Sequence, residues 1–184
     1  MKNVELYKEL HRTTPNYGNG SIMEKHINHL VNLIKKTNSQ TLLDFGCGKG
    51  TQYQSGGMID TIQNKWGGMM PDLYDPAIPN YSKLLTNKSY DGVFSIDVME
   101  HIPEEEVKDT LQLIFDRAIK FVFLGIATRL AGTKLSNGEN AHCTVKSTDW
   151  WEQEILEVNG NKGIDTHLHT YGDSNDYRSY TQNI

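Results

Sequence analysis

The sequence predicts an α/β fold, with one doubly wound, mostly parallel sheet that helices cover on both faces. Short apolar runs typical of buried strands alternate along the chain with longer amphipathic runs typical of helices. The length of 184 residues suits one domain rather than two. We therefore treat residues 1–184 as a single domain, in which a helical segment over residues 1–36 leads into the sheet.

The first half of the chain is expected to supply one helix and two strands, with a further helical stretch between the strands. Apolar residues recur at helical spacing over residues 22–34. The run TLLDF, residues 41–45, is short and apolar and contains an acid near its end, which favours a buried parallel strand. Helical spacing resumes over residues 58–66. A second strand runs through residues 69–75, where Pro71 restricts it to a sheet edge or to a later start.

The second half continues the alternation. YDGVFSIDV, residues 90–98, is a clear strand, and residues 103–119 form a strong helix. Pro103 occupies the first turn of that helix, and three glutamates follow it near the positive end of the helix dipole. The apolar run KFVFLGIA, residues 120–127, is the next strand. Strand and helix therefore alternate as a parallel sheet requires.

The chain is expected to close with a helix and an antiparallel hairpin. Residues 147–158 have helical character, and either Ser147 or Thr148 can cap the helix. The tail from residue 164 onward resembles two short strands around a Gly-Asp-Ser-Asn turn.

Composition restricts the classes of partner. The formal net charge of −5 argues against a broad nucleic-acid or anionic-membrane surface and favours a small-molecule substrate. No apolar run approaches the roughly 20 residues that span a bilayer, and the polar start lacks the apolar core of a secretory signal. Two cysteines, Cys47 and Cys143, cannot form a disulfide framework, so we expect a cytoplasmic protein.

The stretch LLDFGCGKGTQY, residues 42–53, carries three alternating glycines directly after the first strand. Gly46, Gly48 and Gly50 are spaced G-x-G-x-G, whereas a dinucleotide loop is spaced G-x-G-x-x-G. A phosphate loop would place its lysine later, before Ser or Thr. An acid, Asp44, stands two residues before the first glycine. This stretch resembles motif I of the class I S-adenosylmethionine-dependent methyltransferases.

Two further strand ends extend the resemblance over roughly residues 41–127. LYDPA places Asp75, followed by Pro76, where that family carries the acid that hydrogen-bonds both ribose hydroxyls. YDGVFSIDVMEHIP resembles the family's fourth motif and includes Asp97. The resemblance implies S-adenosylmethionine as cofactor. The cofactor-binding residues that it implies are Asp44, Gly46, Gly48, Gly50, Asp75, Pro76 and Asp97.

Two of these acids have alternative roles. Asp44 either reaches the cofactor's ammonium group directly or holds the backbone amides of the glycine loop. Asp97 either lines the pocket near the methionine portion or hydrogen-bonds the backbone at the end of its strand. Glu100, three residues later, is more often a solvated partner of a helix dipole than a pocket residue.

The sequence departs from the family pattern after Asp75. Only fifteen residues, 76–90, separate Asp75 from Asp91, whereas the family fits a helix, a strand and another helix there. A parallel crossover needs a dozen or more residues. We therefore predict a reduced Rossmann-like sheet that lacks the third strand, with Ile78 and Tyr81 covering the cofactor's adenine.

His101 is the candidate general base because an imidazole titrates near neutrality and this one follows a strand end. Its alternative role is to cap the next helix or to pack beside the cofactor. His142, in the polar loop NGENAHCTV, is a second candidate on the acceptor side.

The stretch IATRLAGTKLSNGENAHCTVKSTDWW, residues 126–151, resembles the corresponding region of small methyltransferase-like proteins of phages and bacteria, which implies a phage source. By that resemblance, a loop over the substrate side contains Arg129, Asn140, His142 and Trp150.

Other residues favour ordinary structural roles. His26 and His29 share a helix face, and His167 and His169 share a strand face, so each pair could hold a metal ion. No third ligand follows from the spacing, so we expect solvated histidines and predict no metal. A plain turn is likewise favoured over a pocket role for the residues Tyr17 and Gly18.

The sequence thus predicts methyl transfer from S-adenosylmethionine to an oxygen or nitrogen atom of a small molecule. The motifs identify the cofactor better than the reaction, so a regulatory binding domain or a lyase or hydrolase of the same cofactor is the alternative. Glycine spacing disfavours a nicotinamide-dependent oxidoreductase. A nucleic-acid acceptor is disfavoured because DVME stands where base methyltransferases carry Asp/Asn-Pro-Pro-Tyr/Phe. The oligomeric state does not follow from the sequence.

Overall fold

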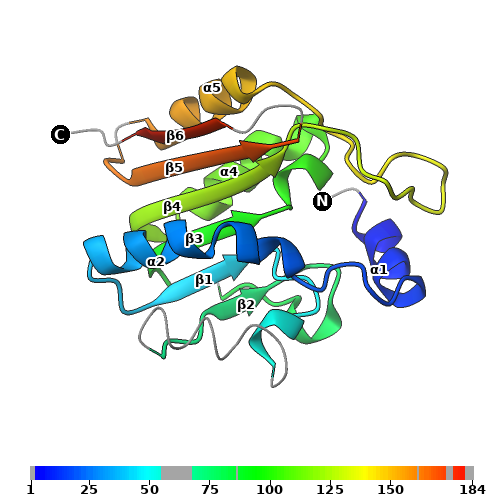
Figure 1. Ribbon diagram of the computed structural model, residues 1–184, viewed down its shortest axis with the longest axis horizontal. Helices are drawn as coiled ribbons and strands as arrows, with labels where there is room; N and C mark the ends of the chain where they lie inside the picture. The colour runs from blue at the N-terminus through cyan, green and yellow to red at the C-terminus, as the bar shows by residue number, and fades with distance from the viewer. Residues whose placement is uncertain (1–2, 55–67, 86, 161, 173–175, 181–184) are drawn as a thin grey trace.

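The computed structural model describes residues 3–54, 68–85, 87–160, 162–172 and 176–180, and a twisted sheet forms its centre (Figure 1). Six strands in the order β2-β1-β3-β4-β5-β6 make up the sheet. They are β1 (Leu42–Phe45), β2 (Asp72–Tyr74), β3 (Tyr90–Ile96), β4 (Ala118–Ala127), β5 (Asp165–Tyr171) and β6 (Asp176–Tyr180). All neighbours pair in parallel except β5 and β6, which pair antiparallel. The mostly parallel sheet and its C-terminal hairpin are therefore confirmed.

Helices cover both faces of the sheet (Figure 1). On one face lies α2 (Ile27–Lys36), preceded by the 3₁₀ turn η1 (Ser21–Lys25). On the other face lie α4 (Val107–Phe115) and α5 (Thr148–Asn159). Alternate side chains of each strand enter opposite cores. For example, Val93 packs with α4 and α5, whereas its neighbour Phe94 packs with α2.

The α4 region is shorter than the expected helix over residues 103–119. Residues Glu104–Glu106 form a 3₁₀ turn, η5, and α4 ends at Phe115. Strand β4 begins at Ala118, two residues before the expected start. Helical spacing alone did not locate the boundary between α4 and β4. Leu113 and Ile119 continue the apolar pattern of the sequence, although both side chains are exposed.

Strand β2 bears out both consequences of Pro71, since it begins at Asp72 and lies at the sheet edge. Between β2 and β3, residues 75–85 and 87–89 contain one 3₁₀ turn, η3 (Pro79–Tyr81), and no strand. The expected helix over residues 58–66 lies outside the described residues. β1 thus has β2 on one side and β3 on the other, so the winding reverses beside β1.

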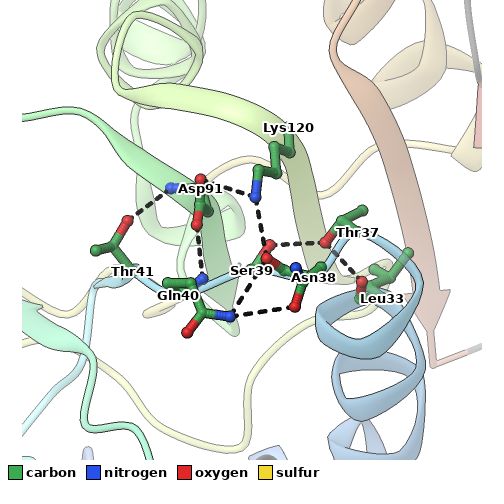
Figure 2. Close-up of polar contacts among 8 residues, drawn as sticks. All are labelled: Leu33, Thr37, Asn38, Ser39, Gln40, Thr41, Asp91 and Lys120. Carbon is green, nitrogen blue, oxygen red and sulfur yellow. Dashed lines mark hydrogen bonds and ion pairs between the residues drawn. The ribbon is translucent and has the colours of Figure 1, made fainter.

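The entry from α2 into β1 is held by polar contacts at the amino ends of the strands (Figure 2). The Asp91 carboxylate accepts the Gln40 amide at 2.6 Å and pairs with the Lys120 ammonium at 3.1 Å. Thr41 Oγ1 accepts the backbone amide of Asp91 at 2.9 Å. Figure 2 also shows Lys120 reaching the Asn38 carbonyl. Asp91 therefore joins β1, β3 and β4 at the end of the sheet away from the glycine loop.

The remaining helices complete the fold. Ser147 caps α5 by accepting the Trp150 amide, as one of the two expected caps. Helix α1 (Val4–Thr13) lies beyond the carboxyl ends of the parallel strands (Figure 1). Among the described residues, no helix has both the length and the apolar character needed to cross a membrane.

Candidate functional site

A cavity of about 270 Å³, called the main cavity below, opens at the carboxyl ends of β1, β2 and β3, beside the point where the winding reverses. Parallel strands bring the residues that follow them to one edge, where ligands of such sheets bind. Six predicted site residues line this cavity: Gly46, Gly48, Asp75, Pro76, Asp97 and His101. The sequence motifs therefore converge in space although they lie up to 55 positions apart, from Gly46 to His101.

The glycine loop is held by the end of β2. The amides of Gly46 and Cys47 donate to the Tyr74 carbonyl at 2.7 and 3.1 Å. Gly48 has a φ of 57°, and a Cβ atom there would lie 2.5 Å from the Gly18 carbonyl oxygen. A backbone conformation and a contact of this kind require glycine. The chain segment that lies so close to the loop is thus the one before α2.

Asp75 stands at the centre of the site. Its two carboxylate oxygens accept the backbone amides of Gly48 at 2.9 Å and Ala77 at 2.8 Å. The residue is only 8% exposed, and burial raises its pKa above the ordinary value. Each carboxylate oxygen can accept more than one hydrogen bond, so Asp75 can also accept hydroxyl groups of a ligand.

Asp44 lies in a second, smaller cavity of about 60 Å³ that shares Gly46, Gly48 and Asp97 with the first. Its carboxyl accepts the Tyr53 hydroxyl at 2.7 Å and the Gln52 side-chain amide at 3.3 Å. Burial raises the pKa of Asp44 to about 7.

The two roles foreseen for Asp44 are not equally supported by these contacts. The glycine-loop amides donate to Tyr74 and Asp75 instead. Asp44 supports the loop only indirectly, because Gln52 also donates to the Cys47 carbonyl at 3.2 Å. The carboxyl of Asp44 therefore remains directed to the small cavity that it lines.

Gly50 lies away from both cavities. A Cβ atom on it would meet the Tyr81 ring at 3.1 Å and Leu73 at 3.2 Å. Ile78 and Tyr81, the expected cover for an adenine, do not line the main cavity either. The part of that loop which does line it is formed by Pro76 and Ala77.

His101 ends the 3₁₀ turn η4 (Met99–His101) and lines the cavity. Its Nδ1 lies 2.7 Å from the Ala141 carbonyl oxygen, so Nδ1 carries the proton and Nε2 carries the lone pair. Burial, with a smaller contribution from His142, lowers the pKa of His101 to about 4. His101 is therefore a neutral imidazole at pH 7 with its lone pair on Nε2, and it does not titrate near neutrality as the sequence led us to expect.

His142 contacts His101 but does not line the main cavity, since the two ring centroids lie 4.7 Å apart in an edge-on arrangement. Its Nδ1 lies 2.6 Å from the Arg129 carbonyl oxygen, and the residue is 9% exposed. Sequence reasoning expected an exposed loop histidine or an acceptor contact. The histidine is in fact buried behind His101.

The half-buried Asp97 and the buried Glu100 form an acidic pair beside these histidines. Asp97 has a φ of 61°, and its Oδ1 accepts the Tyr171 hydroxyl at 2.5 Å. Glu100 is fully buried, and its Oε1 accepts the Ala127 amide at 2.7 Å. Burial, and then the nearby Asp97 carboxylate, raises the pKa of Glu100. The expectation of a solvated Glu100 is therefore wrong.

No family model, curated protein or solved structure matches this chain. The function is therefore inferred from the residues and geometry of this site.

The structure adds one wall that the sequence motifs did not predict. Val4, Tyr7 and His11, on one face of α1, line the main cavity. The Tyr7 hydroxyl donates to the Ala141 carbonyl at 2.7 Å, which fixes α1 to the loop that also binds His101. The spacing of these three residues, i, i+3 and i+7, is a helical signal that was available in the sequence.

The segment between α1 and α2 supplies the rest of that wall. Tyr17 and Gly18 line the cavity, and the Gly18 carbonyl accepts the Lys49 amide at 2.8 Å. The segment is a turn, as expected, but this turn also forms part of the cavity wall.

Three residues expected over the substrate side have structural contacts instead. The Asn140 side chain bonds both backbone groups of Ala131. Trp150 packs edge-on against Trp151, and the Arg129 side chain lies close to Gly172. None of the three lines the main cavity.

The two histidine pairs meet across α2 and β5. His26 Nδ1 lies 3.0 Å from His169 Nδ1, and His29 stacks on Tyr177 at 4.6 Å between centroids. His26 is fully buried and His167 is 6% exposed, so the solvated interpretation is wrong for both. Burial lowers the pKa of His26 to about 3, which keeps it neutral in the folded protein.

Proposed function

We propose that this protein binds S-adenosylmethionine and transfers its methyl group to a small-molecule acceptor. The observation that supports the proposal most directly is the meeting of the glycine loop, Asp75 and Asp97 around one cavity at the strand ends. The sheet agrees with the proposed architecture, a reduced Rossmann-like fold in which β3 follows β2 without an intervening strand.

The residues present suit the parts of the cofactor. Asp75 would hold the ribose, because its carboxylate lines the main cavity and can accept hydroxyl groups. The smaller cavity suits the ammonium of the methionine portion, because the Asp44 carboxyl lines it beside Gln52. Gln52 Oε1 is buried without a hydrogen-bond partner and would accept an ammonium proton.

Bound S-adenosylmethionine would supply an electrophilic methyl group on a sulfonium. The protein's own contribution is to align the acceptor and to exclude water from the cavity. Tyr17, Phe45 and Val98 provide an apolar wall for that purpose. His101 would take the acceptor's proton at Nε2, since its Nδ1 is already bound to Ala141. The net charge of −5 favours a small acceptor over a nucleic acid.

The test combines binding and product analysis. Calorimetry should show binding of S-adenosylmethionine and S-adenosylhomocysteine and no binding of NADH. Mass spectrometry of incubations with small hydroxyl, carboxyl and amine compounds should show S-adenosylhomocysteine and a methylated product only when an acceptor is present. Cleavage of the cofactor without an acceptor would instead indicate a lyase or hydrolase. Binding without any turnover would indicate a regulatory domain.

Asp44 makes the affinity for the cofactor depend on pH. A protonated Asp44 cannot pair with an ammonium, and burial raises the pKa of this carboxyl to about 7. As pH falls below that value, binding must first remove a proton, so affinity should fall by up to about tenfold per pH unit. Calorimetry across this range measures the slope, and Asp44→Asn should flatten it.

Adenosine provides the matched control for this prediction because it carries the ribose but no ammonium. Its affinity should not follow the titration of Asp44. An equal slope for adenosine and S-adenosylmethionine would show that Asp44 does not contact the ammonium.

A further inference from the structure

Three side chains beside the main cavity have the composition and spacing of a metal site. Ligand atoms of Asp97, Glu100 and His142 all lie within 4.8 Å of one another. Three ligands at about 2.0–2.2 Å from one ion lie at most about 3.5–3.8 Å from one another, so side-chain movements of up to about 1 Å would close the site. Among the residues that the structure describes, this is the one group of His, Cys, Asp and Glu with such spacing.

Each of the three side chains uses one atom for orientation and keeps another available. Asp97 Oδ1 accepts the Tyr171 hydroxyl, and Glu100 Oε1 accepts the Ala127 amide. His142 donates its Nδ1 proton to the Arg129 carbonyl, which leaves the lone pair on Nε2. A histidine that binds a metal usually donates its other ring N–H to a carbonyl or carboxylate in this manner.

The second oxygen of Glu100 lies beside the Asp97 carboxylate and has no hydrogen-bond donor. Glu100 is fully buried, and its Oε2 has no hydrogen-bond partner. In the described part of the chain, no lysine or arginine forms an ion pair with Glu100 or Asp97. Buried carboxylates require a compensating charge or a proton. A bound cation would supply that charge.

We propose that Asp97, Glu100 and His142 bind one divalent transition-metal ion. Two carboxylate oxygens and one imidazole nitrogen, without a thiolate, suit Mn²⁺, Fe²⁺ or Zn²⁺ better than Mg²⁺, which prefers oxygen ligands and its own waters. Three protein ligands leave coordination positions open for water or another ligand. Because Asp97 also lines the main cavity, those positions are next to the candidate site.

The ion extends the chemistry available to the acceptor. A metal-bound hydroxyl group loses its proton more readily than a free one. His101, whose ring lies 4.7 Å from that of His142, would be close enough to receive such a proton. This role rests on the proposed methyl transfer, whereas binding of the ion does not.

The test is an electron paramagnetic resonance titration of the full-length protein with Mn²⁺ alone, in the absence of any cofactor. We expect saturable binding of one ion per chain and an imidazole-nitrogen coupling in the pulsed spectrum. Glu100→Gln keeps an oxygen that can accept the Ala127 amide, so it preserves this hydrogen bond while removing a charged ligand. It should weaken Mn²⁺ binding by at least about 100-fold.

Two further variants keep the result interpretable. His142→Asn should weaken binding to a similar degree and abolish the nitrogen coupling, even if Glu100→Gln fails to fold. Glu104→Gln makes the same chemical change on an exposed side chain that pairs with Lys146, and this variant should bind Mn²⁺ as the wild type does.

Absence of saturable Mn²⁺ binding to the wild type would overturn the proposal and indicate a proton shared by Asp97 and Glu100. Binding unaffected by both site variants would overturn it as well. Because no cofactor is present, neither result depends on S-adenosylmethionine binding.

Discussion

Replacing Asp75 with alanine should weaken S-adenosylmethionine binding by about one to two orders of magnitude, because hydrogen bonds to a charged group contribute roughly 1.5–3 kcal/mol. The variant removes the carboxylate that would hold the ribose. It also leaves the amides of Gly48 and Ala77 without their acceptor, so the glycine loop should lose order. Calorimetry measures the affinity, and thermal unfolding measures the accompanying loss of stability.

Two variants separate these effects. Asp75→Asn keeps an oxygen that can accept one of the two amides and should retain more stability than alanine, while still losing the charge. Asp72→Asn is the matched control because Asp72 begins β2, the strand that Asp75 follows, but binds Lys88 and Tyr90 outside the cavity. An affinity for S-adenosylmethionine that is unchanged in Asp75→Ala would remove Asp75 from the site.

Replacing His101 with alanine should lower turnover by about 10²–10⁴-fold while leaving cofactor affinity nearly intact. The physical reason is that Nε2 would be the proton acceptor in the proposed reaction, whereas the Nδ1 bond to Ala141 only sets the ring's orientation. His101→Gln should not restore turnover, because an amide cannot accept the proton. The rate of S-adenosylhomocysteine release, measured with the acceptor identified by the product screen, tests the prediction.

The control for His101 is His29→Ala, since His29 is a partly buried histidine on α2 that lines neither cavity at the strand ends. Its turnover should equal that of the wild type. A proportional loss of cofactor affinity and turnover in His101→Ala would place His101 in the binding wall instead. No change in either quantity would mean that the acceptor enters already deprotonated.

The parts of the fold that sequence analysis located depend on local chemistry. Pro71 cannot donate to a sheet ladder, and Ser147 can cap a helix, whatever the rest of the chain does. The alternation of strands and helices along the chain also indicated where each strand ends and which residues stand at its end. Asp75 and Asp97 could therefore be placed at one sheet edge before any contact was known.

The parts that sequence analysis missed depend on contacts between distant segments. Tyr7 belongs to a polar segment with little apolar character, and its role appears only once Ala141 is beside it. Glu100 looked like a solvated acid because nothing local shows that Ala127 would cover it. His26 is buried by Phe123 of β4 and His169 of β5, which follow it by 97 and 143 residues. Local patterns contain no information on such pairings.

The attachment of α1 has a consequence for the order of folding. The hydroxyl of Tyr7 is bound to residue 141, a separation of 134 positions, whereas the sheet grows by pairing strands that are closer in sequence. Closing so long a loop is slow relative to local contacts, and during synthesis the first helix must wait until most of the chain has left the ribosome. Helix α1 is made before the loop that binds it and is thus among the last of these elements to dock. A nascent chain would acquire a complete cavity wall only after β4 and the loop that follows it have formed.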